Sequence, residues 1–408
     1  MNSLRIVVVG GGAAGFFAAI TCAEAAPESE VTVLERGPQF LAKVRISGGG
    51  RCNVTHACFD GREFATRYPR GSRELIGAFQ RFQARDTVAW FEARGVKLKT
   101  EPDGRMFPAT NSSQTIIECL MGAAQSAGVK PVSNCGVVGA TQRSETGFEL
   151  TLATGEKMQC DCLLLATGGC RAAAAGQLAV ALGHTLEPPV PSLFTFHVAT
   201  PWLRALAGVS VDSAEVSVPE TDLRERGPVL VTHWGLSGPA ILRLSAWGAR
   251  WLHGANYHFP LWVNWLPGLT PEMISKEFQI RRDTQGARLV VNAPLAPLSA
   301  RLWQALVQAA GLGREARWAT LTREQTQQLA RQLTQTELAV TGKSLNQDEF
   351  VTCGGVRLRE VNFKTMESRV CPGLYFAGEL LDLDGITGGF NFQAAWTTGW
   401  LAGRAMAT

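Results

Sequence analysis

The sequence lacks a strong charge of either sign. Its 39 Lys and Arg residues nearly balance its 35 Asp and Glu residues, which leaves a net charge of +4 and a pI of about 8.6. An excess this small argues against nucleic acid as a partner, because nucleic-acid-binding domains usually carry a dense basic surface. Residues 62–105 are locally rich in Arg and Lys, and there we expect a solvated face with some anion contacts.

The chain also lacks the Cys-x-x-Cys spacing, although it contains ten cysteines. Its absence argues against a zinc site or a redox-active dithiol, so we expect no metal. Scattered thiols without a convincing signal segment predict a reduced, cytoplasmic protein. The uncharged run at residues 6–23 is as long as a membrane span or a secretory signal, but three consecutive glycines divide it. We therefore expect no membrane attachment.

Tyrosine is rare, with three residues, whereas tryptophan is frequent after position 200, where we expect core or interface packing. The length of 408 residues exceeds one ordinary hydrophobic core and suggests two or three domains. A hydrophobic content of 46% and a mean hydropathy of +0.03 are typical of globular domains.

The strongest local signal lies in residues 4–35. An apolar run is followed by Gly10-Gly11-Gly12-Ala13-Ala14-Gly15, a second apolar stretch, and a third apolar run that ends in Glu35. The spacing of Gly10, Gly12 and Gly15 is the dinucleotide-binding fingerprint, in which glycines permit a tight turn, close approach of a pyrophosphate and close helix packing. The helix N-terminus offers free N–H groups to phosphates. Glu35 follows Gly15 by 20 residues, where an acid binds the ribose.

Four more glycine motifs occur along the chain. Ser47-Gly48-Gly49-Gly50-Arg51-Cys52-Asn53 is too rich in glycine for a helix or strand interior and predicts a loop against a ligand. Buried strands are predicted before Ala166-Thr167-Gly168-Gly169 and before Ala377-Gly378-Glu379. Asp384-Gly385-Ile386-Thr387-Gly388-Gly389-Phe390-Asn391 opens a helix predicted over residues 392–407.

Together these motifs resemble the BaiN/YhiN-like family of three-domain FAD flavoproteins, which includes aminoacetone oxidase-like members. The resemblance covers nearly the whole chain, including Gly104-Arg105-Met106-Phe107-Pro108, Thr232-His233-Trp234-Gly235-Leu236-Ser237-Gly238-Pro239 and Phe350-Val351-Thr352-Cys353-Gly354-Gly355-Val356. Two places depart from the family pattern. His56 follows Thr55 where the family has Asn, and residues 171–175 replace a turn rich in Gly, Ser and Thr.

The resemblance implies FAD as the cofactor, bound by residues from both ends of the chain. The implied cofactor set is Gly10, Gly12, Ala13, Ala14, Gly15, Glu35, Arg36, Lys43, Ser47, Gly50, Arg51, Cys52, Asn53, Val138, Thr167, Gly168, Gly378, Glu379, Gly388, Gly389, Phe390 and Asn391. Within it, Val138 would hold the adenine through its backbone, and Glu379 would face the ribityl or pyrophosphate region. The last helix would direct its N-terminus at the pyrimidine end of the flavin. His233 is the candidate acid or base, although a hydrogen-bonded structural role is favoured.

These signals predict an α/β fold. We expect a Rossmann-like FAD-binding domain of the two-dinucleotide-fold flavoprotein type, with an inserted β-barrel domain and a helical subdomain. Stacked prolines near residue 188 mark a boundary, and residues 72–94 have the periodicity of a helix. The predicted segments are 1–188 and 356–408 for the FAD-binding domain, 189–269 and 336–355 for the barrel, and 270–335 for the helical insertion.

The expected function is that of an FAD-dependent oxidoreductase. Hydride would pass between flavin N5 and a small organic substrate, in a cleft between the FAD-binding and barrel domains. Because no second dinucleotide fingerprint occurs, either NAD(P)H visits transiently or oxygen reoxidises the flavin. Two alternatives stay open: a non-catalytic flavin-binding or redox-sensing protein, and a flavin-dependent RNA-modifying enzyme, against which the mild charge argues. The substrate and the oligomeric state are open as well.

Overall fold

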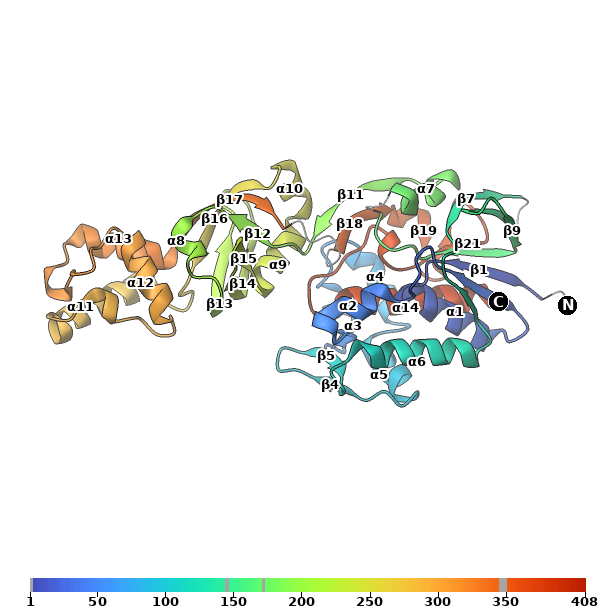
Figure 1. Cartoon of the computed structure of the whole chain (residues 1–408), viewed down its shortest axis with the longest axis horizontal. Coiled ribbons are helices and arrows are strands. Elements are labelled where there is room, and N and C mark those ends of the chain that lie inside the picture. Colours follow the sequence, from blue (N-terminus) through green and yellow to red (C-terminus); the bar gives the residue numbers. More distant parts are fainter. Residues whose placement is uncertain (1–2, 144–146, 171–172, 345–350) are drawn as a thin grey trace. The chain divides into compact units, whose positions relative to one another are not determined.

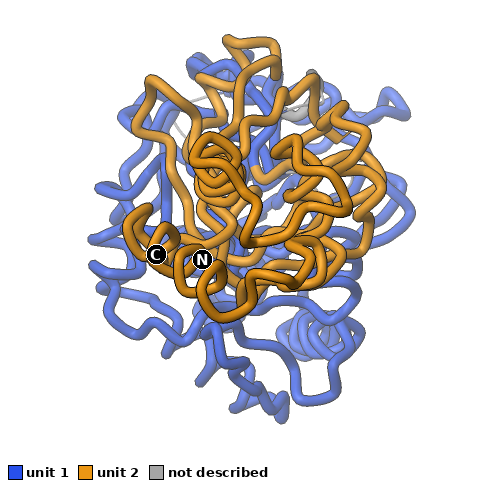
Figure 2. The backbone as a smooth tube through the Cα atoms, turned by 90° about the vertical axis from the view of Figure 1, so that its left-hand side faces the viewer, with its two compact units in different colours: residues 1–192, 347–408 blue, residues 193–346 orange. Residues whose placement is uncertain are grey.

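The computed structural model describes residues 3–143, 147–170, 173–344 and 351–408 (Figure 1), except that the side chains of residues 173–175 are not described. The chain divides into two compact units (Figure 2). Unit 1 consists of Met1–Ser192 and Gln347–Thr408, and unit 2 is Leu193–Asn346. Among the helices in the described ranges, none is both long and apolar enough to cross a membrane.

Unit 1 is built on a seven-stranded sheet with the order β19-β20-β21-β10-β1-β2-β6. These strands are β1 (Arg5–Val9), β2 (Glu30–Leu34), β6 (Lys130–Val132), β10 (Cys162–Leu165), β19 (Val361–Asn362), β20 (Glu367–Ser368) and β21 (Leu374–Phe376). The pairs from β6 to β21 are all parallel, with Val8 opposite Val33 on one side and Leu164 on the other. The adjacent strands β1 and β10 are buried at residues 6–9 and 163–165. Burial on both faces of the sheet explains why these runs are continuously apolar.

The first and last helices of unit 1, α1 (Ala13–Ala25) and α14 (Phe390–Met406), lie side by side (Figure 1). Two glycines of α14 permit this close packing. A Cβ at Gly399 would lie 2.7 Å from the Ala14 oxygen, and one at Gly403 would lie 2.4 Å from the Ala18 oxygen. The two ends of the chain therefore pack against each other within unit 1.

Shorter elements complete unit 1. Its other helices are α2 (Ala42–Gly50), α3 (Gly61–Ala65), α4 (Ser72–Phe79), α5 (Ala84–Glu92), α6 (Ser113–Ser126), α7 (Ala173–Ala181), η3 (Leu358–Glu360) and η4 (Gly378–Leu380). Two three-stranded sheets join β3 (Thr55–His56), β5 (Arg105–Pro108) and β4 (Leu98–Thr100), and β7 (Val137–Gln142), β8 (Phe148–Leu152) and β9 (Lys157–Cys160).

The helix expected over residues 72–94 is divided into α4 and α5. A new helix starts at Gln83 because this residue and Asp86 form a reciprocal capping box, with the Gln83 N–H donating to Asp86 Oδ2 at 2.8 Å. The periodicity was correct for each part but did not show the break.

The stacked prolines do not end the first segment of unit 1. They lie in β11 (Leu186–Ser192), which pairs antiparallel with β18 (Val351–Val356) across a bulge between Glu187 and Val190. Prolines are tolerated there for two reasons. Each strand of this two-stranded sheet has one unpaired edge, and residues in the bulge do not need to donate a hydrogen bond to the partner strand. Our boundary at residue 188 is corrected to Ser192. The assignment of residues 336–355 to the barrel is wrong for β18, which belongs to unit 1.

Unit 2 contains a closed barrel with the cyclic order β12-β15-β14-β13-β16-β17. Its strands are β12 (Phe196–Val198), β13 (Ser210–Ser217), β14 (Arg224–Val231), β15 (Gly235–Ser237), β16 (His258–Asn264) and β17 (Thr336–Lys343). Burial alternates along β16, where Phe259, Leu261 and Val263 face the interior. The short helices are α8 (Pro201–Arg204), α9 (Pro239–Trp247) and α10 (Ala249–Gly254).

The helical insertion lies between β16 and β17. It contains α11 (Pro271–Gln285), η1 (Val290–Asn292), α12 (Ala300–Ala309), η2 (Trp318–Thr320) and α13 (Arg323–Thr334). Trp303 and Trp318 fill its core, and Trp303 Nε1 donates to the Val290 oxygen at 2.7 Å. The predicted class is confirmed: an α/β Rossmann-type domain carries an inserted barrel and a helical subdomain.

Candidate functional site

The predicted cofactor residues gather at one edge of the parallel sheet. Gly10, Glu35, Thr167 and Gly378 follow β1, β2, β10 and β21, so all four lie at the carboxyl ends of adjacent parallel strands. Ligands of open α/β sheets bind outside these ends. The turns are in direct contact, because Gly10 has φ 117° and a Cβ there would lie 2.3 Å from the Ala166 oxygen.

The start of α1 is open and free of acids. Its N-cap is Gly12, which makes no side-chain cap, and its first turn contains no acidic residue. A Cβ at Gly12 would meet nothing within 4 Å, whereas one at Gly15 would lie 2.0 Å from the Gly10 oxygen. The helix start therefore presents free N–H groups to open space, which suits an anionic group.

Glu35 is held in place by two backbone amides. Its Oε2 accepts from the Gly11 N–H at 2.9 Å and its Oε1 accepts from the Gly37 N–H at 2.8 Å. Each carboxylate oxygen keeps a further acceptor site, so the group can also bind ligand hydroxyls. Arg36 is exposed, and its Cγ would lie 3.3 Å from a Cβ at Gly136. Val138 follows on β7 and is 65% exposed.

The glycine loop at the end of α2 has backbone conformations that residues other than glycine rarely adopt. Ser47 is extended, and Gly48, Gly49 and Gly50 have φ values of 58°, 68° and 83°. A Cβ at Gly49 or Gly50 would meet no atom within 4 Å. The prediction of a loop rather than a helix interior is confirmed. The open side of this loop, at Gly49 and Gly50, can offer backbone groups to a ligand.

Arg51, Cys52 and Asn53 anchor this loop. Arg51 Nη1 pairs with Glu101 Oε1 at 2.7 Å, and its guanidinium lies 4.0 Å from the Phe107 ring centre. Burial raises the pKa of the Cys52 thiol to about 12, so this cysteine stays protonated. The contacts of Arg51 hold the loop in place, and the cofactor-binding role of Arg51, Cys52 and Asn53 stays a prediction.

Asn53 connects the loop to the start of α14. With its amide oxygen facing the Gly389 nitrogen at 3.0 Å and its amide nitrogen facing the Thr55 oxygen at 3.1 Å, both groups are satisfied. Gly389 has φ 93°, and a Cβ there would lie 2.5 Å from the Thr55 oxygen. The first turn of α14 contains no acidic residue, so this second helix start also favours an anion or a carbonyl oxygen.

Two further interactions hold the loop before α14. Asn391 Nδ2 donates to the Gly385 oxygen at 2.8 Å, and the Gly385 N–H donates back to Asn391 Oδ1 at 2.8 Å. Arg70 binds both oxygens of the fully buried Asp384, which also accepts from the Ser192 hydroxyl at 2.7 Å. Burial raises the pKa of Asp384, and the Arg70 charge opposes that rise.

Lys43 and Glu379 join three elements at the sheet edge. Lys43 Nζ pairs with Glu379 Oε2 at 2.6 Å, and the Thr352 N–H donates to Glu379 Oε1 at 2.8 Å. The lysine is 57% exposed, whereas the glutamate is 19% exposed. Glu379 is therefore positioned mainly by the backbone of β18.

His56 was not among the predicted site residues. Its ring stacks on Phe390 at 4.9 Å with an interplanar angle of 23°, and its Nε2 lies 3.1 Å from the Asp103 oxygen. The buried Nδ1 has no hydrogen-bond partner among the described residues, and burial lowers the pKa of the ring. The available signal was the departure from the family pattern at this position.

The cofactor set lies entirely in unit 1, whereas His233 is exposed on the turn between β14 and β15 in unit 2. That turn is held by Thr232, whose hydroxyl accepts from the Gly235 N–H at 3.2 Å. Within residues 3–143, 147–170, 173–344 and 351–408, His233 forms no ion pair with an acid, and its role stays a prediction. Phe350 and residues 171–172, singled out from the sequence, lie outside the described residues.

The residues present fit FAD. An acid-free helix start with open space at Gly12 matches a diphosphate, and the fixed Glu35 carboxylate matches ribose hydroxyls. The second acid-free helix start, at Gly389, matches the electron-rich end of a flavin ring.

Comparison with known proteins identifies a family for this chain. A family model described as the HI0933-like protein Rossmann domain matches residues 4–405. A 3-dehydro-bile acid delta(4,6)-reductase of Clostridium scindens is 29% identical over 99% of both chains. A ribosomal RNA dihydrouridine synthase of Escherichia coli is 30% identical over 98% of this chain and 97% of its own length. A 3-ketosteroid-delta4-(5alpha)-dehydrogenase from Rhodococcus jostii RHA1 has a similar structure, with a TM-score of 0.54 and 14% identity over 99% of this chain and 97% of its own, a likeness of fold alone.

Proposed function

The chain belongs to the HI0933-like Rossmann-domain family and is an FAD-dependent oxidoreductase, and we propose that it reduces a carbon–carbon double bond conjugated to a carbonyl group. The first substrate candidate is a small cyclic enone. The observation that carries the proposal is the chemistry shared by the names of the two full-length relatives.

The two names describe one type of reaction. A delta(4,6)-reductase of a 3-dehydro bile acid acts on double bonds in a 3-oxo compound. A dihydrouridine synthase makes the form of uridine whose ring double bond has gained two hydrogens, and that bond is conjugated to a ring carbonyl. In both cases the carbonyl draws electrons from the double bond. The double-bond carbon farther from the carbonyl therefore accepts hydride, and the double-bond carbon next to the carbonyl accepts a proton.

FAD, when bound, supplies hydride transfer at N5 of its ring. The chain holds it by the α1 start, by Glu35 and by the glycine loop at the end of α2. Gly388 and Gly389 let the backbone pack closely at the start of α14, because a Cβ would lie 2.8 Å from Phe390 Cε2 at Gly388 and 2.5 Å from the Thr55 oxygen at Gly389.

His56 is the group that we assign to proton handling at this edge. Its Nε2–H donates to the Asp103 oxygen, which leaves Nδ1 as the unprotonated nitrogen beside Phe390. Burial lowers the pKa of the ring, so its neutral form dominates at pH 7. A proton taken from solvent onto Nδ1 would then pass readily to the substrate carbon, because an imidazolium with a lowered pKa is the stronger acid.

Electrons for this reduction are expected from NAD(P)H as a transient co-substrate. Only one dinucleotide fingerprint occurs in the sequence, and the cofactor set uses it. NAD(P)H would therefore bind without a Rossmann domain of its own.

The experiment is an anaerobic two-step reaction. The purified flavoprotein is reduced with NADPH or NADH and then mixed with a 3-oxo-Δ4 steroid, with the saturated 3-oxo steroid as the control. We expect flavin reoxidation and a product with two added hydrogens only with the unsaturated compound. Failure of every enone to reoxidise the flavin, together with rapid reoxidation by oxygen, would instead support an oxidase.

A uridine in RNA is the second candidate, and one charge observation favours it. Residues 270–335 contain nine Lys and Arg but five Asp and Glu, so the helical insertion carries the whole net charge of +4. The insertion is basic and the remaining residues together carry no net charge, a distribution that favours contact between the insertion and RNA. RNA binding that weakens steeply as salt rises, and dihydrouridine formation in that RNA, would support this candidate over the enone.

A further inference from the structure

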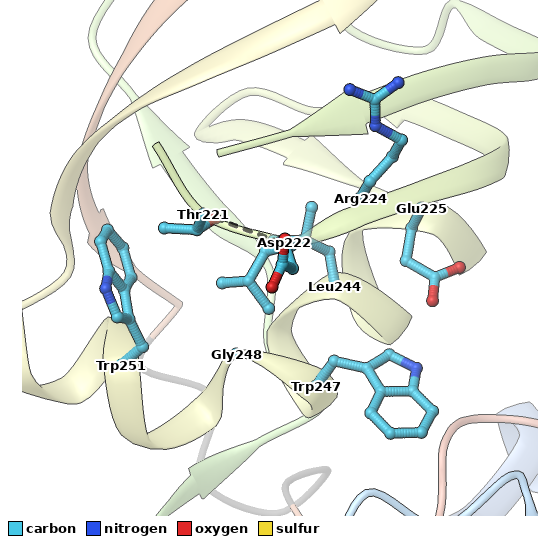
Figure 3. A pocket seen from close by; sticks show the side chains of 9 residues that line it. Thr221, Asp222, Arg224, Glu225, Leu244, Trp247, Gly248 and Trp251 are labelled. Atoms are coloured by element: carbon cyan, nitrogen blue, oxygen red, sulfur yellow. Dashed lines mark hydrogen bonds between the residues drawn. The ribbon is translucent and has the colours of Figure 1, made fainter. Parts of the chain in front are cut away.

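A hollow of about 450 Å³ lies on unit 2 (Figure 3), and none of its lining residues belongs to the predicted cofactor set. One side is the connection from β13 to β14, with Asp222, and the first residues of β14, with Glu225. The other side consists of α9 and α10. Its volume is in the range of small-molecule sites.

Two tryptophans form the walls of the hollow. Trp247 ends α9 and is 42% exposed, and Trp251 lies on α10 and is 45% exposed. Large apolar rings are usually covered in a folded protein, because each Å² of exposed apolar surface costs about 25 cal/mol. Two half-exposed indoles that line one cavity therefore indicate a surface that a ligand covers.

The cavity is already formed by its backbone. Thr221 fixes the connecting turn, since its hydroxyl donates to the Val218 oxygen at 2.8 Å and accepts from the Leu223 N–H at 3.1 Å. A Cβ at Gly248 would lie 2.7 Å from Leu223 Cδ1, so the junction of the two helices sits directly against this turn. A ligand would bind without reorganising the backbone, which favours affinity.

Three charged residues line the hollow, and only one of them has no ion-pair partner among the described residues. Arg224 pairs with Glu215 at 3.0 Å, and Glu225 pairs with Arg243 at 2.8 Å, so these charges are balanced. Asp222 forms no ion pair within the part of the chain that the structure describes. Figure 3 shows its carboxylate directed into the hollow, with the two indoles on either side.

We propose that this hollow binds an organic cation, an ammonium or guanidinium group on an apolar or aromatic body. The indole faces attract a cation through their π electrons, and the unbalanced Asp222 carboxylate supplies the opposite charge. The cation would come from a free small molecule or from a Lys side chain of another protein. The inference does not depend on the flavin chemistry, because unit 2 alone supplies every residue.

The test measures binding to the full-length flavoprotein by calorimetry. The probes are choline, its uncharged isostere 3,3-dimethyl-1-butanol, and a short peptide with one trimethylated lysine. We expect choline or the peptide to bind, and the isostere to bind at least about fivefold more weakly. Tighter binding of the peptide would identify a protein side chain as the source, and tighter binding of choline would identify a free molecule.

Three variants separate a specific site from general surface binding. Asp222→Asn and Trp247→Ala should each weaken the cation about fivefold or more, with unchanged melting temperature, because both side chains are exposed. Trp234→Ala is the matched control, since this indole is 68% exposed and lies outside the hollow. Equal affinity for choline and its isostere, no binding of either cation, or equal weakening by Trp234→Ala would overturn the proposal.

Discussion

Gly12 is the position where flavin binding can be separated from folding. Its φ of −92° and ψ of −169° are accessible to any residue, and an added Cβ meets nothing within 4 Å. Gly12→Val should therefore cost only the poorer helix cap, about 1 kcal/mol. The same side chain would fill the space that a pyrophosphate needs to reach the α1 N–H groups. Losing two hydrogen bonds to a charged phosphate costs about 3–6 kcal/mol, which is a ~10²–10⁴-fold loss of affinity.

The assay compares flavin content with stability. Visible flavin absorbance per protein measures binding, and chemical unfolding of the flavin-stripped proteins measures stability. Gly15→Val is not equivalent, because its Cβ would lie 2.0 Å from the Gly10 oxygen and should destabilise the fold itself. The matched control is Gly122→Ala, which is exposed on α6, also meets nothing within 4 Å, and should keep its flavin while gaining up to about 1 kcal/mol. A stable Gly12→Val protein with a full complement of flavin would refute the assignment of this helix start.

Three further predictions concern the groups around the site. Asp384→Asn should lower the free energy of unfolding by about 3 kcal/mol or more, because the largely buried Arg70 then loses its ion pair with Asp384, and Arg70→Met in the same chain should recover part of the loss. Lys43→Ala should cost less than about 1 kcal/mol because the lysine is exposed, whereas Glu379→Ala should cost more because a backbone N–H also loses its acceptor. The pKa of His56 is lower in the folded state than the ordinary 6.5, so below that pH the unfolded state binds more protons and the stability falls as the pH falls. His56→Asn should flatten this decline in unfolding experiments from pH 7 to pH 5, and an unchanged slope would contradict the assigned burial.

The cofactor site could be predicted from the sequence because its signals are local. Gly10 and Gly15 are required by contacts within one strand–turn–helix unit, where a Cβ would strike a backbone oxygen. Buried parallel strands are apolar on both faces, so the runs before Glu35, Thr167 and Gly378 could be recognised without knowing their neighbours. Adjacency of parallel strands then brings their ends together.

Long-range pairing could not be predicted in the same way. The prolines of β11 argue against a strand when considered alone, and only the pairing of Ser192 with Val351, far along the chain, makes a two-stranded ribbon. The stacking of His56 on Phe390 joins positions separated by more than 300 residues. The capping of Gln83 by Asp86 is local, but the apolar period continues across it and masks the break.

The identities of the relatives constrain the reaction more than the substrate. Values of 29% and 30% over nearly full length place this chain at similar distances from two proteins whose names give different substrates. What those names share is hydrogen addition to an activated double bond, and the cofactor residues that we propose for this chain lie wholly in unit 1. The barrel and helical insertion supply none of the cofactor set, so they can change their charge and their cavities without altering the flavin site. Substrate choice should therefore follow from side chains such as those of the basic insertion, and similarity across the whole chain is a weak guide to it.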